Sequence, residues 1–310
     1  MNIALHMPNA KRLAWWTREL RQLLPEHTVL PHDEIITLAD VDIAVVWKPP
    51  PGWLASLPNL QLTISIGAGI DHIVMDPTYP ENVPIVKTTG PEMIERMREY
   101  IVLHVLRFHR QLPLIQAQQA EKTWKSVITP TASQRQIGIM GMGGMGQAAA
   151  TSIAQLGFTV RCWSRSPKKA ADVESFYGNE QLSAFANGTD ILVCLLPLTD
   201  ATKGILSQAL FSSLAQGACL INAARGQHLI EKDLLSALKS GQLSYATLDV
   251  FHVEPLPESH AFWTHPQILV TPHVASLIDP SSGGRVIAEN IERFANGEAP
   301  DGMTVSSQGF

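Results

Sequence analysis

A glycine-rich hexapeptide lies near the middle of this 310-residue chain and limits the possible folds to a few: Gly141-Met142-Gly143-Gly144-Met145-Gly146. An apolar run, Ile137–Met140, precedes it and a helical pattern, Met145–Leu156, follows it, so the G-x-G-x-x-G spacing lies between a predicted strand and a predicted helix. The first glycine permits a tight turn, the second lets a pyrophosphate approach the backbone, and the third lets helix and strand pack closely. A second apolar run, Thr159–Trp163, favours a dinucleotide-binding unit over a simple turn.

The turn after the second strand, Trp163-Ser164-Arg165-Ser166-Pro167-Lys168-Lys169, contains no acidic residue. NAD-binding units usually carry Asp or Glu there, which binds the ribose 2′-hydroxyl and would repel a 2′-phosphate. The guanidinium of Arg165 can bind a phosphate through two hydrogen bonds, and the hydroxyls of Ser164 and Ser166 can donate to it. The sequence therefore predicts NADPH/NADP as the cofactor, with NADH weaker, although a solvated basic turn is the alternative.

The composition excludes several classes of protein. Hydrophobic residues are 45% and charged residues 16% of the chain, no apolar run reaches the roughly 18 residues of a membrane span, and the N-terminus lacks a secretory signal pattern. The net charge of −5 argues against a general affinity for nucleic acid. Cys162, Cys194 and Cys219 have no metal-ligand spacing and are expected to be reduced. We expect a cytoplasmic protein with no metal, membrane or nucleic-acid partner.

Apolar strand candidates alternate with helical segments along the whole chain, which predicts parallel sheets built from βαβ units. The candidates are Asn2–Met7, Val41–Trp47 and Leu60–Ile66, then Ile191–Leu196, Ala218–Ala223, Tyr245–Val250 and Ile268–Thr271. The last helix candidate, Val286–Asn296, follows two glycines. We expect an α/β protein with two doubly wound parallel-sheet domains. A Rossmann-type nucleotide-binding domain, 98–281, is inserted in a discontinuous flavodoxin-like substrate-binding domain, 1–97 and 282–310.

Two further segments connect these parts. Glu92–Gln111 is the longest helix candidate, and its apolar residues recur at steps of three and four. A polar stretch, Gln116–Gln136, follows as a connector that contains Trp124. Helices at Ser207–Ala215 and Lys232–Ser240 are expected between the later strands.

Three segments after strand ends carry residues suited to catalysis. They are Ile221-Asn222-Ala223-Ala224-Arg225-Gly226, the run from Leu248 to Pro257, and Val270-Thr271-Pro272-His273-Val274-Ala275-Ser276. Together with the glycine motif, their order and spacing resemble the D-isomer-specific 2-hydroxyacid dehydrogenase family. Within it, the Trp-Ser-Arg turn, Val46–Pro50 and the Gly-Ala-Gly-Ile-Asp turn at 67–71 look most like the glyoxylate/hydroxypyruvate reductase A group.

The residue types fit the reduction of a 2-oxo acid. Arg225 can hold the carboxylate and carbonyl oxygens of the substrate through its planar fork. His273 can donate the proton to the developing alkoxide. Glu254 can accept a hydrogen bond from the other ring nitrogen and so fix the tautomer. The family resemblance implies that these three are the catalytic residues, and we expect them to converge where the nicotinamide ring lies.

The resemblance also implies binding residues outside the catalytic three. Asp249 and the Ala223 carbonyl would hold the nicotinamide carboxamide, and the backbone amides of Ala68 and Gly69 would bind the substrate carboxylate. We also place Pro197 at the cofactor site. Trp47 is expected either to face a small substrate or to pack in the core. A homodimer through the Glu92–Gln111 helix and the Gln116–Gln136 arm is expected from the resemblance.

The first hypothesis is therefore NADPH-dependent reduction of glyoxylate to glycolate and of hydroxypyruvate to D-glycerate. One alternative is a dehydrogenase for another 2-oxo acid, such as pyruvate or a phenylpyruvate. Another is a nucleotide-sensing protein without turnover, which would have no use for a proton donor held by a carboxylate. A methyltransferase would typically have an acid where Ser164 and Arg165 stand.

Overall fold

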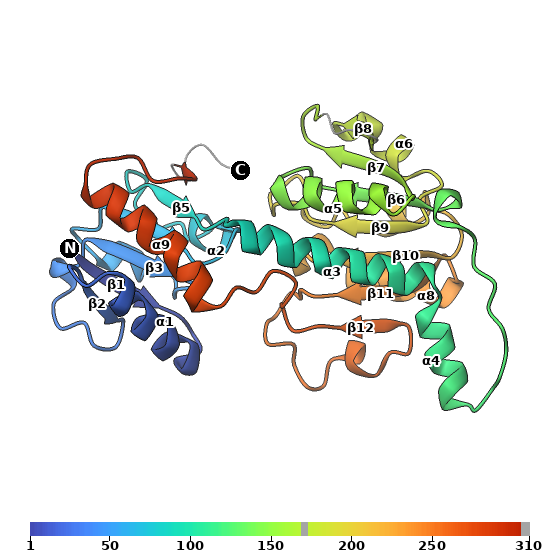
Figure 1. Cartoon of the computed structure of the whole chain (residues 1–310), viewed down its shortest axis with the longest axis horizontal. Coiled ribbons are helices and arrows are strands. Elements are labelled where there is room, and N and C mark those ends of the chain that lie inside the picture. The colour runs from blue at the N-terminus through green and yellow to red at the C-terminus, as the bar shows by residue number, and fades with distance from the viewer. Residues whose placement is uncertain (169–172, 305–310) are drawn as a thin grey trace. The chain divides into compact units, whose positions relative to one another are not determined.

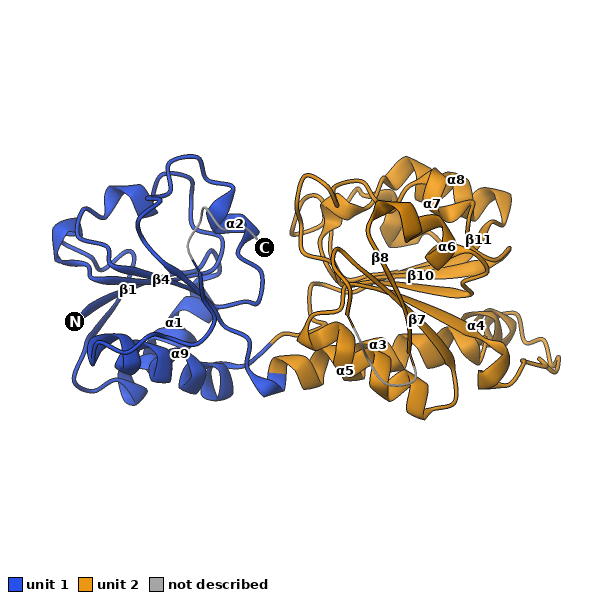
Figure 2. Cartoon of the chain, turned by 90° about the horizontal axis from the view of Figure 1, so that it is seen from above, with its two compact units in different colours: residues 1–92, 278–310 blue, residues 93–277 orange. Residues whose placement is uncertain are grey.

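The computed structural model describes residues 1–168 and 173–304, which form two compact α/β units (Figure 1, Figure 2). Unit 1 comprises Met1–Glu92 and the chain from Ile278 onward, and unit 2 comprises Met93–Leu277. The chain thus passes between the units a few residues before each of the expected boundaries, at 97/98 and 281/282. The last six residues of the expected substrate-binding domain lie outside the described residues.

Unit 1 is built on a six-stranded sheet in the order β13-β5-β4-β3-β1-β2. Its first five strands are parallel, and only the short β13 is antiparallel to its neighbour β5. The order 2-1-3-4-5 of the parallel strands is that of the flavodoxin-like fold, as expected. The strands are β1 (Asn2–His6), β2 (Thr28–Pro31), β3 (Ile43–Val46), β4 (Leu62–Ser65), β5 (Ile85–Lys87) and β13 (Met303–Thr304).

Helices α1 (Ala10–Leu23) and α9 (Pro280–Ala295) pack together on one face of this sheet (Figure 2). The helix predicted from the sequence began only at Val286, because two glycines precede this residue and glycine usually interrupts a helix. This start is wrong, since α9 begins at Pro280. A Cβ on Gly283 would meet Trp16 and Ile278, so the glycine allows the two helices to approach closely. Asp279 caps α9 by accepting from the amides of Ser281 and Ser282. The unit also contains a short helix, α2 (Asp71–Val74).

Unit 2 is built on a seven-stranded, all-parallel sheet in the order β12-β11-β10-β9-β6-β7-β8. Counted from β6, this is the 3-2-1-4-5-6 order of the Rossmann fold with one strand added. The order reverses between β6 and β9, and ligands bind beyond the strand carboxyl ends at such a point. The strands are β6 (Gln136–Met140), β7 (Thr159–Ser164), β8 (Val173–Tyr177), β9 (Ile191–Cys194), β10 (Ala218–Asn222), β11 (Leu243–Leu248) and β12 (Ile268–Val270).

Helices cover both faces of this second sheet, so both faces are buried (Figure 2). One layer contains α3 (Pro91–His109), whose first two residues belong to unit 1, and α5 (Gly144–Gln155). The other contains α6 (Leu182–Ala186), α7 (Gln208–Phe211) and α8 (Glu231–Ser240). The three cysteines are buried in this unit without disulfides, and burial raises the pKa of each thiol to about 12.

Two expectations for unit 2 need correction. The stretch Gln116–Gln136 is not a connector throughout, because α4 (Leu112–Ala120) includes its first residues and β6 starts at its last. The helix expected over Ser207–Ala215 is shorter, at Gln208–Phe211.

Throughout the described ranges, every helix is either too short or too polar to cross a bilayer.

Candidate active site

The turn between β6 and α5 has the stereochemistry that the glycine motif predicts. Gly141 has a φ of +105°, and a Cβ there would lie 2.6 Å from the Leu195 carbonyl oxygen. A Cβ on Gly146 would collide with the carbonyl of Gly141. These two glycines are therefore required by the protein's own packing. A Cβ on Gly143, in contrast, would meet nothing within 4 Å. Gly143 therefore borders open space in front of the α5 N-terminus, which fits an approaching pyrophosphate.

The end of β7 presents polar and basic groups beside this turn. β6 and β7 are parallel neighbours, and Met140 is in register with Trp163, so their carboxyl ends adjoin. Ser164 is buried and its hydroxyl donates to the Ser166 carbonyl at 2.8 Å. Arg165 is exposed and forms no hydrogen bond or ion pair with any other described residue. Its guanidinium is available to an anion, which fits a cofactor with a 2′-phosphate. Lys169, at the end of the same basic run, lies outside the described residues.

Arg225 lies in a turn that follows β10 and is shaped by a buried asparagine. Asn222 is fully buried; its side chain accepts from the Ala224 amide at 3.2 Å and donates to the Arg225 carbonyl at 3.1 Å. The Arg225 guanidinium donates to the Ala224 carbonyl at 2.7 Å. A Cβ on Gly226 would collide with the backbone of Phe251. The arginine turn is therefore packed directly against the segment that carries Glu254.

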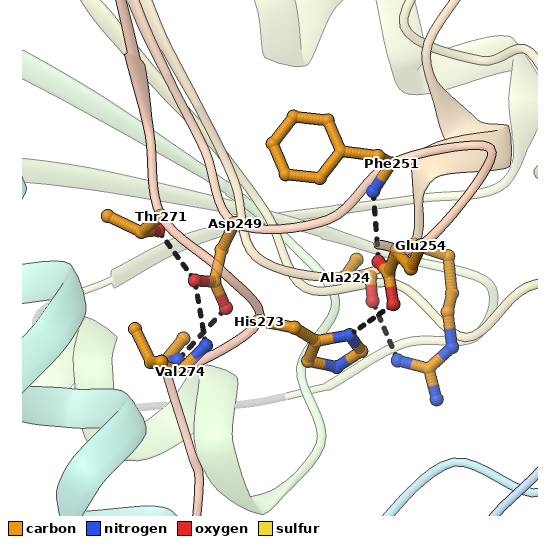
Figure 3. Close-up of polar contacts among 9 residues, drawn as sticks. Ala224, Asp249, Phe251, Glu254, Thr271, His273 and Val274 are labelled. Carbon is orange, nitrogen blue, oxygen red and sulfur yellow. Dashed lines mark hydrogen bonds and ion pairs between the residues drawn. The ribbon is translucent and has the colours of Figure 1, made fainter. Parts of the chain in front are cut away.

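His273 and Glu254 form a hydrogen-bonded pair in unit 2 (Figure 3). His273 Nδ1 lies 2.8 Å from Glu254 Oε2, and the other carboxylate oxygen accepts from the Phe251 amide at 3.0 Å. The imidazole is about a third exposed and the carboxylate less. Because Nδ1 is hydrogen-bonded to the carboxylate, a proton that His273 transfers to another group must come from Nε2. This contact was predicted from the sequence.

Asp249 follows β11 and is almost completely buried. Its Oδ1 accepts from the Thr271 hydroxyl at 2.6 Å and the Val274 amide at 2.9 Å, and its Oδ2 accepts from the Ala275 amide at 2.9 Å (Figure 3). Burial raises the pKa of Asp249, and these hydrogen bonds and the nearby His273 oppose the rise. In the structure, this carboxylate therefore organises the backbone that carries His273.

The other expected cofactor residues of unit 2 lie at the carboxyl ends of neighbouring strands. Ala223 follows β10; its amide donates to the Cys194 carbonyl at 3.3 Å, and its own carbonyl accepts no hydrogen bond within the described ranges. Pro197 follows β9, and its carbonyl accepts from the Thr202 hydroxyl at 2.8 Å. The Ala223 carbonyl is therefore open to an outside donor, such as a carboxamide.

The expected substrate residues of unit 1 share one edge of its sheet. Trp47 follows β3, and its ring covers Gly67, where a Cβ would lie 2.6 Å from the indole. The Trp47 ring also contacts His72, with ring centroids 4.9 Å apart. The hydroxyl of Ser65 donates to the Gly69 carbonyl at 3.0 Å. The amides of Ala68 and Gly69 donate to no acceptor in the part of the chain that the structure describes. They are free to bind an anion.

The structure thus places the expected residues at strand ends, in the loops that follow the strands or, for Gly144, Met145 and Gly146, in the first turn of α5. It brings the Arg225 turn, Glu254 and His273 together in unit 2. Roles for Gly226, Tyr100 and Thr271 in the site were not predicted. Gly226 could have been noticed because it directly follows the arginine. Tyr100, on α3, contacts Thr271 across 171 residues of sequence, and no local pattern signals such a pair.

Comparison with known proteins bears on what this site does. The model for the D-isomer specific 2-hydroxyacid dehydrogenase NAD binding domain matches residues 102–275. A curated relative from Serratia proteamaculans, named glyoxylate/hydroxypyruvate reductase A, is 42% identical over 313 residues, which cover 98% of either chain.

Two solved structures are similar over the full chain. A D-isomer specific 2-hydroxyacid dehydrogenase from Xanthobacter autotrophicus, in complex with NADPH and MES, has a TM-score of 0.92 and 36% identity, covering 100% of this chain and 99% of the other. An NADPH-dependent glyoxylate/hydroxypyruvate reductase from Sinorhizobium meliloti, in complex with NADP and sulfate, has a TM-score of 0.91 and 34% identity with the same coverage.

Proposed function

Because this chain belongs to the D-isomer specific 2-hydroxyacid dehydrogenase family, we propose that it uses NADPH to reduce glyoxylate to glycolate and hydroxypyruvate to D-glycerate. The observation that carries the proposal is the His273–Glu254 pair, held at 2.8 Å beside the Arg225 turn. A protein that only senses a nucleotide needs no such proton donor. The NADPH-dependent and NADP-bound relatives support the choice of cofactor.

The cofactor is proposed to bind along the carboxyl edge of the unit 2 sheet. The pyrophosphate would lie over Gly143 at the N-terminus of α5, and the 2′-phosphate would contact Ser164, Arg165 and Ser166. The carbonyl of Ala223 and the carboxylate of Asp249 would receive the nicotinamide carboxamide. When bound, the reduced nicotinamide supplies a hydride to the carbonyl carbon of the substrate.

The protein groups perform the rest of the reaction. Arg225 would bind the substrate carboxylate and carbonyl oxygens and stabilise the charge that develops on the carbonyl oxygen. His273 would transfer the proton on Nε2 to that oxygen as the hydride arrives, so a 2-oxo acid becomes a 2-hydroxy acid. Glu254 would hold the imidazole by Nδ1 and stabilise its protonated form. In unit 1, the amides of Ala68 and Gly69 would bind the substrate carboxylate.

The preference for small oxo acids is proposed from Trp47. Its ring covers Gly67, the first residue of the turn that carries the two free amides. An indole in that place leaves little room for a bulky substituent on the substrate. A site with the same catalytic residues and a differently shaped substrate pocket would reduce pyruvate or a phenylpyruvate. This is the alternative to test.

The test is a panel of steady-state assays that follow NADPH and NADH oxidation with glyoxylate, hydroxypyruvate, pyruvate and phenylpyruvate. We expect the highest kcat/KM for glyoxylate or hydroxypyruvate with NADPH. His273→Ala should lower kcat by about 10²–10⁴-fold, the usual contribution of a general acid, while the Kd of NADPH stays within about twofold. Wild-type protein that binds NADPH but reduces none of the four acids would contradict the proposal and favour a sensor.

The remaining proposals concern the protein's setting. We propose a cytoplasmic enzyme that works as a homodimer on a small 2-oxo acid, without nucleic-acid or membrane partners. The dimer is supported by exposed apolar side chains in the segment after α3. Trp124 and Ile128 are almost fully exposed, and Leu112, Leu114 and Ile115 of α4 are each more than a third exposed.

A further inference from the structure

A chain of hydrogen bonds leads from helix α3 to the backbone of the proposed proton donor. The Tyr100 hydroxyl on α3 lies 2.7 Å from the Thr271 hydroxyl, which lies 2.6 Å from Asp249 Oδ1 (Figure 3 shows the second of these contacts). The backbone carbonyl of Asp249 accepts from the amide of His273 at 2.9 Å. Nothing in the reaction proposed above uses Tyr100 or Thr271.

The direction of these hydrogen bonds follows from counting protons. An ionised carboxylate can only accept, so Thr271 must donate its single hydroxyl hydrogen to Asp249. Thr271 therefore has to accept from Tyr100, which donates. Each donor strengthens the next in such a chain. The phenol thus fixes which way the threonine hydroxyl points, and the threonine in turn fixes the carboxylate.

Asp249 holds a strained residue in place through its main chain and its side chain. His273 has a φ of +54°, in the left-handed region that non-glycine residues rarely adopt. Such a conformation persists only when the surrounding structure specifies it. Here the main chain and side chain of Asp249 bind three successive amides, those of His273, Val274 and Ala275, each at 2.9 Å. Asp249 therefore fixes the backbone from which the imidazole projects.

We propose that Tyr100 and Thr271 are positioning residues that orient the Asp249 carboxylate and thereby hold His273 in the conformation that proton transfer requires. This inference rests on the proposed reductase function. The reaction proposed above gives neither residue a contact with substrate or cofactor, and their hydrogen bonds lead to Asp249. Their effect is therefore exerted through Asp249 and is expected in the pH dependence of turnover.

The ionisable groups near Asp249 and along this chain of hydrogen bonds determine the sign of that effect. Burial raises the pKa of Asp249, whereas the Thr271 hydrogen bond and the charge of His273 lower it. On α3, burial also raises the pKa of Tyr100, so the phenol stays neutral. His104, whose ring packs on Tyr100, has its pKa lowered to about 4 by burial and by Arg107 and is also neutral.

Removing the Thr271 hydroxyl takes away an interaction that lowers the pKa of Asp249, so that pKa should rise further. Asp249 would then become protonated at a higher pH, and a protonated carboxyl binds the amides of Val274 and Ala275 less well. The acidic limb of the kcat profile should therefore move to higher pH. Tyr100→Phe should move it in the same direction by less, because Thr271 can still donate.

The experiment measures kcat against pH for glyoxylate reduction with saturating NADPH in the full-length protein. For Thr271→Val we expect the acidic limb to move up by about half to one pH unit and kcat at neutral pH to fall about fivefold to tenfold. For Tyr100→Phe, both the position of the acidic limb and kcat at neutral pH should lie between those of Thr271→Val and wild type. Thr271→Ser keeps the hydroxyl and should restore both properties.

Unit 1 contains a matched control. Tyr79 is buried, and its hydroxyl lies 3.0 Å from the Thr63 hydroxyl and 3.1 Å from the Val83 carbonyl. Tyr79→Phe therefore removes a buried tyrosine hydrogen bond from the unit that does not contain His273. It should cost a similar amount of thermal stability and leave the pH profile unchanged. If Tyr100→Phe and Thr271→Val lose only stability, as the control does, Tyr100 and Thr271 are structural residues and the inference is overturned.

A second measurement does not depend on activity. The Val274 and Ala275 amides should exchange hydrogen faster in Thr271→Val than in wild type, and at the wild-type rate in Tyr79→Phe. Unchanged exchange would overturn the inference even in a protein that reduces no oxo acid, whereas wild-type protein without activity would contradict only the proposed function. If Thr271→Val fails to fold, Tyr100→Phe serves alone in both measurements.

Discussion

At the scale of single residues, Arg165 is expected to decide which nicotinamide cofactor this chain prefers. It follows β7, is exposed, and no acid stands beside it in the turn. Charged hydrogen bonds contribute about 1.5–3 kcal/mol, so Arg165→Ala should weaken NADPH binding by roughly tenfold to 150-fold. Fluorescence titration of the purified variant with NADPH measures this change.

The matched controls for Arg165 separate charge from geometry. NADH lacks the 2′-phosphate, so its Kd should change less than twofold in Arg165→Ala. Arg165→Lys keeps the charge but loses the planar fork, so its Kd for NADPH should lie between those of wild type and Arg165→Ala. An equal loss of affinity for both cofactors would mean that Arg165 supports the fold of the turn and not the phosphate.

The site residues divide into those that sequence could predict and those that it could not. The contact between Glu254 and His273 was predictable because each residue follows a strand of the same parallel sheet, and the ends of such strands adjoin. The role of Asp249 in binding the backbone of 274 and 275 was not, because main-chain partners depend on the exact path of the loop.

At the scale of elements, the turn from β6 to α5 makes opposite predictions for two of its glycines. Gly143→Ala places a methyl group in open space, so the fold should be unaffected, but the methyl group should displace the pyrophosphate. We expect the thermal midpoint to stay within about 2 °C and the Kd of NADPH to rise about tenfold or more. Differential scanning calorimetry and cofactor titration test the two parts.

Gly146→Ala is the comparison for this prediction. Its Cβ would collide with the Gly141 carbonyl, so this variant should lose stability whether or not cofactor is present. The two substitutions add the same methyl group three residues apart. If Gly143→Ala binds NADPH as wild type does, the pyrophosphate does not lie over this turn.

The elements themselves were predictable where burial is continuous. Strands β6, β9 and β10 are apolar runs buried on both faces, and the sequence located each to within two residues. Strand β8, at the edge of its sheet, was not predicted because its five residues are mostly exposed. The predicted start of α9 was too late, because glycine normally interrupts a helix, whereas Gly283 here allows the close approach of α1.

At the scale of the whole molecule, the segment between α4 and β6 is expected to bind a second copy of the chain. It runs from 121 to 131 without helix or strand (Figure 1), and its Trp124 is fully exposed to solvent. Burying a tryptophan removes about 200 Å² from water, which is worth about 5 kcal/mol at most. In a twofold dimer every such residue is buried twice, so this segment alone contributes substantially to association.

The double variant Trp124→Ser, Ile128→Ser should therefore run as a monomer in size-exclusion chromatography with light scattering, at half the mass of the wild-type dimer. Trp15→Ser, Ile36→Ser is the matched control, because it removes an exposed tryptophan and an exposed isoleucine from unit 1. The control should remain a dimer. The segment does not form the dimer interface if the 124/128 variant keeps the mass of two chains. Wild-type protein with the mass of one chain across a hundredfold range of concentration would contradict the dimer itself.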